Sequence, residues 1–172
     1  MPCALTKGYS LDCRDSVGGL RQVLIAEFTA VTATTANATG EITAISMAST
    51  KKFWRYQLPK NVGSATETIT SSAEAGTTFY AQEVKIALNK LSSSVRQELA
   101  LLAVGRLMVA VQDQNGAWWM HGIINSLEVT GGTAGTGTNF GDRNGYDLTL
   151  TGMEPNFAAP VLPAVWTTAI TG

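Results

Sequence analysis

The glycine-rich segment at residues 131–143 is the first place where residue spacing suggests chemistry. A P-loop needs GxxxxGK[ST], in which backbone amides and a lysine hold phosphates. Gly132 and Gly137 have that spacing, but Thr138 stands where the lysine is required. A dinucleotide fingerprint needs GxGxxG between a strand and a helix, whereas the later glycines are spaced differently and a strand follows them. Neither phosphate-binding motif is present.

Catalytic groups are scarce elsewhere in the sequence. His121 is the only histidine, and it alternates with Trp118 and Met120 in a strand-like run, a position typical of a structural side chain. Glu83 and Lys85 share one face of a strand, which more often makes a solvated stripe than an acid–base pair. No HExxH or GxSxG motif occurs. We therefore predict that the protein is not an enzyme and needs no cofactor.

Two cysteines, Cys3 and Cys13, lie near the start of the chain without a CxxC motif or a neighbouring histidine. This pattern favours free thiols over a metal site. The sequence shows no basic leader followed by an apolar run, and no stretch of about 18 apolar residues that could cross a membrane. We expect a protein made in a cytosol, or released from one by lysis, with no membrane insertion.

The glycine-rich segment therefore reads as a loop of roughly fifteen residues between two strands. Loops of this length are uncommon in compact domains unless they have a function. We expect contact with a neighbouring subunit to order this loop, and plain disorder is the alternative. The candidate contact residues are Gly132, Gly135, Gly137, Phe140, Asp142 and Arg143.

Period-two alternation dominates the chain and predicts half-buried strands. The longest alternating run, at 77–89, would span roughly 40 Å and indicates a hairpin that projects beyond the core. The predicted strands lie at 20–33, 41–46, 52–58, 64–72, 77–89, 106–113, 117–124, 126–130 and 145–152.

One helix is predicted at 93–104. Ser94 and Gln97 have capping-box spacing, and Gly105 is a natural stop. Farther along, Asn115 and Gly116 lie between two strand-like runs, which suits a type I′ hairpin turn with positive φ at both residues. The prediction is a mainly β protein with one α-helix.

The two ends of the chain are predicted to be extended arms on a single domain that covers 1–172. Residues 1–19 form the N-terminal arm, and residues 153–172, with three prolines and no periodicity, form a partly apolar arm that must dock on something or stay loose.

The charge composition suits self-association. Charged residues make up 15% of the chain, which is low, and the net charge is −1. Residues 1–60 carry seven Lys and Arg against four Asp and Glu, while 61–172 carry five against nine. Opposed halves of this kind favour head-to-tail contacts, and the small net charge gives no global field for holding nucleic acid.

Aromatic residues leave a binding module open as a second class. Trp54 and Tyr56 share a strand face and could stack on a sugar ring. Such aromatic pairs more often pack in a core or in a subunit interface. Trp118 and Trp119 are adjacent, so in a strand they point to opposite faces and cannot form one platform.

Three segments together resemble a known family. They are ALTKGYSLDCRDSVGGLRQVLI at 4–25, ITSSAEAGTTFYAQEVKIALNKLS at 69–92 and GTAGTGTNFGDRNGYDLTLTGMEP at 132–155. Their pattern is similar to the tail tube, or major tail, proteins of long-tailed bacteriophages. The resemblance implies a β-sandwich or barrel with a flanking helix, which forms rings, commonly hexameric, that stack into a hollow tube. It also implies assembly in the host cytoplasm, a place in the virion tail, contacts with other tail proteins, and loops and terminal arms that join the rings.

Such a tube must let DNA pass without binding it. Basic residues in the channel would hold phosphates and release counterions, so a neutral or acidic wall is expected. Glu67 and Glu83 are the candidate channel-facing residues, with Lys85 on the same face as Glu83. A neck or tail-terminator ring and a monomeric glycan-binding β-sandwich remain the alternatives.

Overall fold

Two β-sheets and one α-helix make up the described part of the chain. The computed structural model describes residues 8–9, 14–167 and 171–172. The seven-stranded sheet has the order β2 (Val31–Ala36), β3 (Ile42–Met47), β11 (Ala159–Val161), β8 (Trp118–His121), β7 (Leu107–Asp113), β1 (Leu20–Glu27), β4 (Trp54–Gln57). The four-stranded sheet has the order β5 (Ser64–Ser72), β6 (Thr77–Asn89), β10 (Gly145–Glu154), β9 (Glu128–Gly135). The predicted mainly β class is confirmed.

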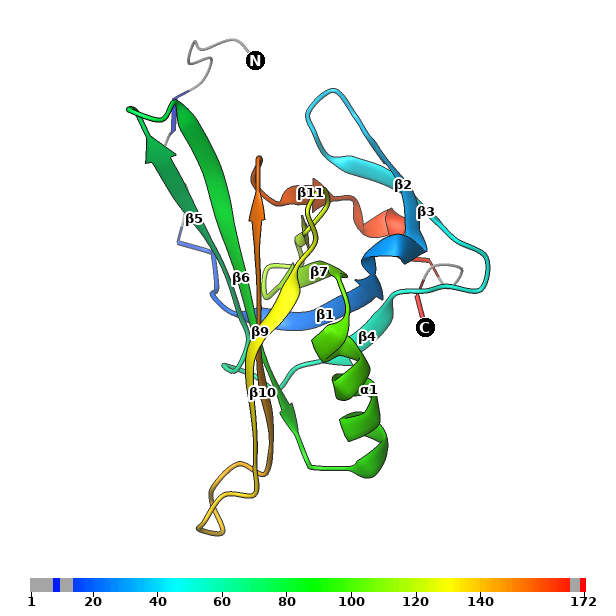
Figure 1. The fold of residues 1–172 in the computed structure, drawn as a ribbon, viewed down its shortest axis with the longest axis vertical. Helices are drawn as coiled ribbons and strands as arrows, with labels where there is room; N and C mark the ends of the chain where they lie inside the picture. Colours follow the sequence, from blue (N-terminus) through cyan, green and yellow to red (C-terminus); the bar gives the residue numbers. More distant parts are fainter. Residues whose placement is uncertain (1–7, 10–13, 168–170) are drawn as a thin grey trace.

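The strands of the two sheets run across one another (Figure 1). A hydrophobic core lies between the sheets and contains Val23 and Ile25 from β1, Val84 from β6 and Leu150 from β10. Helix α1 (Ser93–Val104) adds Leu102 to the edge of this core. The fold is consistent with a β-sandwich.

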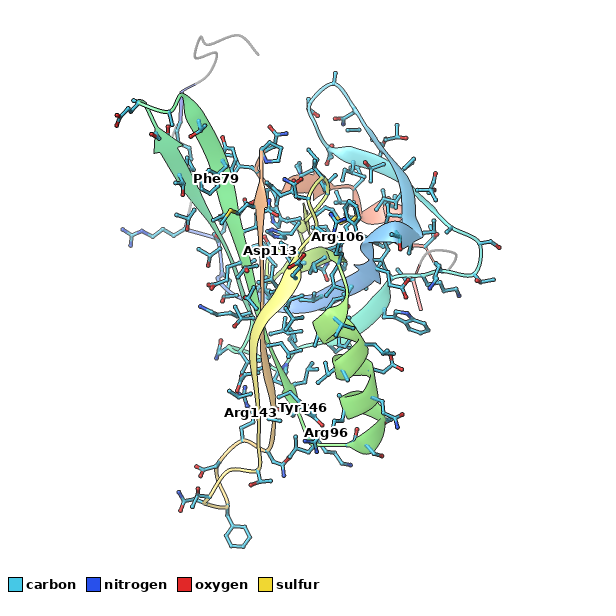
Figure 2. All side chains as sticks on the ribbon, viewed as in Figure 1. Phe79, Arg96, Arg106, Asp113, Arg143 and Tyr146 are labelled. Atoms are coloured by element: carbon cyan, nitrogen blue, oxygen red, sulfur yellow. The ribbon has the colours of Figure 1, made fainter. Side chains whose placement is uncertain are left out.

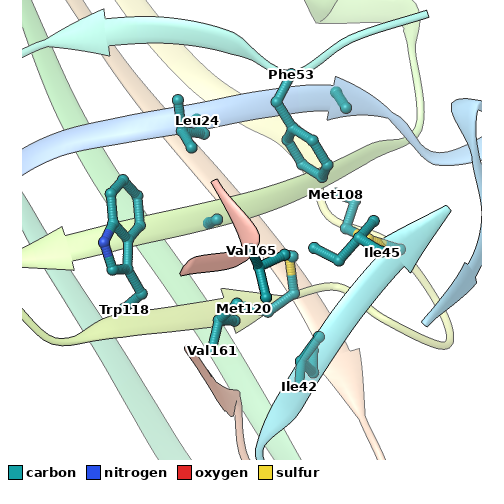
Figure 3. Packing of buried hydrophobic residues seen from close by; sticks show 11 residues of the cluster. Leu24, Ile42, Ile45, Phe53, Met108, Trp118, Met120, Val161 and Val165 are labelled. Atoms are coloured by element: carbon teal, nitrogen blue, oxygen red, sulfur yellow. The ribbon is translucent and has the colours of Figure 1, made fainter. Parts of the chain in front are cut away.

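A second core lies on the other face of the seven-stranded sheet (Figure 3). Leu24 and Ala26, which alternate with the residues of the first core, point into it. The middle of β1 is therefore buried on both faces, and this explains its unbroken apolar run at 23–26.

The predicted strand at 20–33 is interrupted in the structure. A short 3-10 helix, η1 (Phe28–Ala30), separates β1 from β2, and the Phe28 amide donates to the Arg106 carbonyl at 2.8 Å. The turn lets β2 leave β1 and pair with β3 instead. The sequence stays rich in β-formers through the turn, so periodicity alone does not locate it.

The predicted C-terminal arm docks on the chain's own sheet. Met153 and Glu154 complete β10, and β11 lies between β3 and β8, where Val161 pairs with Ile42 and Trp118. The 3-10 helix η2 (Pro163–Val165) follows, and the Trp166 ring then packs 5.3 Å from the Phe53 ring. This segment covers the second core, so the chain itself supplies the docking surface.

Two local details differ from the sequence prediction. Helix α1 is capped by Ser92, whose Oγ accepts from the Val95 amide at 3.3 Å, and not by Ser94. The β7–β8 hairpin has positive φ only at Gly116, and the Gly116 amide donates to the Asp113 carbonyl at 3.2 Å. The type I′ prediction is wrong: this geometry fits a three-residue loop with a type I turn and a glycine bulge.

Candidate functional site at the four-stranded sheet

The four-stranded sheet has one buried and one uncovered face. Strand pairing places Glu83 beside Thr66 and Thr151, while Gln82 lies beside Glu67 and Gly152. Because neighbouring strand residues point to opposite faces, one row of side chains faces the core and the other faces away from it. The core-facing row includes Gln82, Val84 and Ile86. The uncovered row is made mainly of threonines, namely Thr66, Thr68, Thr149 and Thr151, with Ala81 among them.

Opposite charges on the uncovered face neutralise each other. Lys85 Nζ lies 2.7 Å from Glu83 Oε1, and both side chains are open to solvent. A shallow hollow of about 660 Å³ lies beside them, bounded by threonines of β5, β9 and β10 together with Glu128 and Met153. This face can meet a charged polymer without presenting a net positive surface.

Glu67 does not share the face of Glu83. Its carboxylate turns toward the core side, where Oε1 accepts from Gln82 Nε2 at 3.0 Å and from the Ala158 amide at 2.6 Å. The turn at 73–76 pairs Ser72 with Thr77, and this register places Glu67 opposite Gln82. One face of this sheet therefore cannot present both predicted channel-facing residues, and only Glu83 lies with Lys85 on the uncovered face.

The two outer strands of this sheet have free edges. β5 pairs only with β6, and β9 pairs only with β10, in the part of the chain that the structure describes. Natural edge strands are usually protected by lysine, proline or a covering segment. Neither strand contains Lys, Arg or Pro, and most of their residues are exposed. Sequence analysis missed these edges, although the absence of protecting residues at 64–72 and 128–135 was visible.

The glycine-rich loop is shorter than predicted. β9 continues to Gly135, and Gly132 and Gly135 are strand residues opposite Leu148 and Gly145. The loop proper covers 136–144. It forms the tip of the β9–β10 hairpin and projects at the opposite end of the molecule from the β5–β6 tip (Figure 1). Four of the six predicted contact residues, Gly137, Phe140, Asp142 and Arg143, lie in it.

This tip is braced by its own hydrogen bonds. The Asp142 carboxylate accepts from the amides of Thr138 and Asn139 at 2.8 and 2.7 Å. The Asn139 and Thr138 amides hold the pKa of this carboxyl below its usual range. Gly137 has a φ of 70°, which favours glycine.

Arg143 forms an ion pair with Asp147 at the base of the loop. Phe140 is fully exposed in this loop, whose base is marked by the Arg143 label in Figure 2. The tip therefore presents one exposed aromatic ring on a loop held by its own hydrogen bonds.

His121 lies on the core side, away from the uncovered face. It is buried, its Nδ1 has no hydrogen-bond partner, and Glu67 Oε1 is 3.9 Å away. Burial lowers the pKa of His121 to about 4. Among the described residues no three His, Cys, Asp or Glu side chains gather as a metal site. Cys3 and Cys13 lie outside the described residues.

Trp54 and Tyr56 line one hollow of about 360 Å³ beside helix α1. Trp54 is 62% exposed, but Tyr56 is partly buried against the core between the sheets. Gly172 lies against the Trp54 ring and donates its amide to the Phe53 carbonyl at 2.8 Å. Trp118 is buried and Trp119 is partly exposed, as expected for adjacent strand residues.

No family model, curated protein or solved structure matches this chain. No helix within the described ranges is long and apolar enough to cross a membrane.

Proposed function

We propose that this protein is a structural subunit of a phage tail tube, without enzymatic activity, that forms rings around a DNA channel. The observation that carries the proposal is the four-stranded sheet, which has two unpaired edges without Lys, Arg or Pro and one uncovered, nearly neutral face. The family resemblance of the three quoted segments supports the same conclusion.

Lateral assembly follows from the strand directions. β5 runs antiparallel to β6, β6 to β10, and β10 to β9, so β5 and β9 run in opposite directions. Rotation about an axis near the strand direction brings β9 of one copy beside β5 of the next as a new antiparallel pair. Because the two edges are different surfaces, the contact is head-to-tail. A closed ring then pairs both free edges of the four-stranded sheet in every copy.

The uncovered face becomes the channel wall in such a ring. Glu83 and Lys85 lie on it and neutralise each other, and the remaining side chains are mainly threonine. DNA phosphates would find no net positive charge there, so DNA can pass without being held. The two projecting hairpin tips lie at opposite ends of the molecule along these strands (Figure 1), where stacked rings would meet. The assembled tube would be part of the virion tail and would contact other tail proteins.

Electron microscopy and sedimentation of the purified protein test this proposal. We expect rings or tubes to form without a cofactor. Isolated rings that never stack would indicate a neck or tail-terminator ring, and strict monomers at high concentration would favour a binding module and overturn the proposal.

A variant pair makes the test specific for the edge. Gly131→Lys and Gly135→Lys place lysines on β9, where an added Cβ meets open space. Edge lysines discourage strand pairing, so ring formation should fall while the subunit stays folded. Ala44→Lys adds the same charge at an exposed position of β3, outside the four-stranded sheet. This variant should assemble normally.

A further inference from the structure

The end of helix α1 is apolar and largely open to solvent in the described part of the chain. From Leu99 to Val104 the sequence contains no polar residue, yet only Leu99 is fully buried. Val104 is 86% exposed, and Ala100 and Ala103 are exposed beside it. Leu101 is 66% exposed and borders the hollow that Trp54 and Tyr56 line. A helix that is apolar around its whole circumference is normally buried on all sides.

A cavity lies at the opposite edge of the same sheet. It has a volume of about 530 Å³ and is lined by Val17, Trp119 and Phe157, with His121 and Glu67 among its polar residues. Val17, Trp119 and Phe157 are all large apolar side chains that remain solvent-exposed. His121 lines it as a buried side chain with an unpartnered Nδ1.

Both features lie on the core side of the four-stranded sheet. α1 contacts β9, and its Leu102 packs against the core between the sheets. The cavity is bounded by Ala65 and Glu67 of β5 and by Val111 of the seven-stranded sheet. Figure 1 shows α1 on the β9 side of the sheet and the blue segment that leads into β1 on the β5 side. The apolar helix end and the cavity therefore flank the two edges that ring formation would join.

We propose that the exposed helix end Ala100–Val104 of one copy docks against this cavity in the next copy. The inference rests on the proposed ring, because pairing of β9 with β5 is what brings the two surfaces together. Specific interfaces bury about 1,200–2,000 Å² in total, more than one pair of short strands supplies, so a second contact beside the strands is needed. The apolar helix end and the aromatic rim of the cavity are chemically matched for it.

Cross-linking in a chain that carries Cys3→Ser and Cys13→Ser tests the contact. One batch carries Val104→Cys and the other Phe157→Cys, and a short bismaleimide is added after mixing. We expect a covalent dimer from the mixture and none from either batch alone, because the two surfaces are different. Ala44→Cys in place of Val104→Cys is the control and should give no dimer.

A second pair separates this inference from the ring itself. Glu128→Cys on β9 and Thr66→Cys on β5 stand at the same level of the sheet and report on edge pairing in the same assay. If the two strand-edge cysteines cross-link but Val104→Cys and Phe157→Cys do not, the helix contact is overturned and the ring proposal stands. Absence of both dimers would overturn the ring as well.

Assembly measured by sedimentation gives an independent readout. Val104→Lys changes a highly exposed residue near the helix C-terminus, where a positive charge is tolerated, so folding should be unaffected. Loss of an interface anchor commonly lowers affinity at least about tenfold, and assembly should need a correspondingly higher concentration. Assembly of Val104→Lys at the concentration that suffices for the unmodified chain would overturn the inference.

Discussion

Lys85 Nζ and Glu83 Oε1 lie 2.7 Å apart on the uncovered face of the four-stranded sheet. The residues are two positions apart in β6, so their side chains lie on the same face of the sheet. Neither side chain is buried in the core. A solvent-exposed pair of this kind contributes little to stability, at most about 1 kcal/mol. In the proposed tube, the more important effect of Glu83 is to cancel the positive charge of Lys85 on the channel wall.

Glu83→Lys is expected to slow DNA ejection from virions with otherwise normal tails. Two lysines would then stand on the wall of every subunit and bind phosphates, and more strongly at low salt. The subunit should fold normally, since an exposed charge reversal usually costs under about 0.5 kcal/mol. Ejection rates at low and high salt measure the effect.

The matched control exchanges the two charges. Glu83→Lys with Lys85→Glu preserves both the pair and the net charge, so ejection should match that of unmodified virions. If Glu83→Lys virions eject DNA at the normal rate in low salt, the uncovered face is not the channel wall.

His121 should make the folded chain sensitive to mild acid. Burial lowers its folded pKa to about 4, below the unfolded value of 6.5, so the unfolded chain takes up the proton first. Stability is then full above pH 6.5 and falls as the pH drops toward 4, by about 3 kcal/mol in total. Urea unfolding at pH 7 and pH 5 measures the loss.

The interpretation is clean because the chain has one histidine. His121→Leu should flatten the stability profile between pH 7 and pH 5, whatever it does to absolute stability. An unchanged slope in this variant would assign the acid sensitivity to other groups.

Local alternation predicted the faces of individual strands well. Gln82, Val84 and Ile86 are buried while Glu83 and Lys85 are not, as the period-two pattern of 77–89 indicates. The opposite orientations of Trp118 and Trp119 follow from the same rule. These properties depend on the strand itself, so one sequence is enough to predict them.

Features that depend on partners distant in the chain were not predicted. The face of Glu67 depends on the hairpin register, which the turn at 73–76 sets. β11 is three residues long and is held by β3 and β8, so it has no periodicity of its own. The free edges of β5 and β9 become visible only when the strand order is known.

The C-terminal segment should contribute to the stability of each subunit. The Trp166 ring lies 5.3 Å from Phe53 and 5.0 Å from Trp118, over the second core. Trp166→Ala should lower the free energy of unfolding by about 2 kcal/mol, less than for a fully buried tryptophan, because the ring is partly buried against the second core. Trp54→Ala removes the same side chain from an exposed site and should cost about 0.5 kcal/mol. Equal losses in urea unfolding would show that Trp166 does not anchor the segment.

Shortening the β9–β10 tip should leave the folding of the subunit intact but prevent rings from stacking. β9 still pairs with β10 up to Gly135 and Gly145, so residues 136–143 can be replaced by Asn-Gly. Asn144 is kept because it accepts from the Lys90 and Leu91 amides. Unfolding free energy should change by under about 1 kcal/mol, because the exposed loop covers no core. Rings should still form, since both sheet edges are intact, but electron microscopy should show no long tubes.

A point variant tests whether the exposed ring at the tip is responsible. Phe140→Ser keeps the loop length, and it leaves the Asp142 hydrogen bonds to Thr138 and Asn139 in place. Because Phe140 is fully exposed in the subunit, the change should not destabilise it, yet stacking should weaken if the ring enters a neighbouring copy. Stacking lost in the shortened chain but normal in Phe140→Ser would assign the contact to the loop backbone. Long tubes from both variants would show that the tip does not join rings.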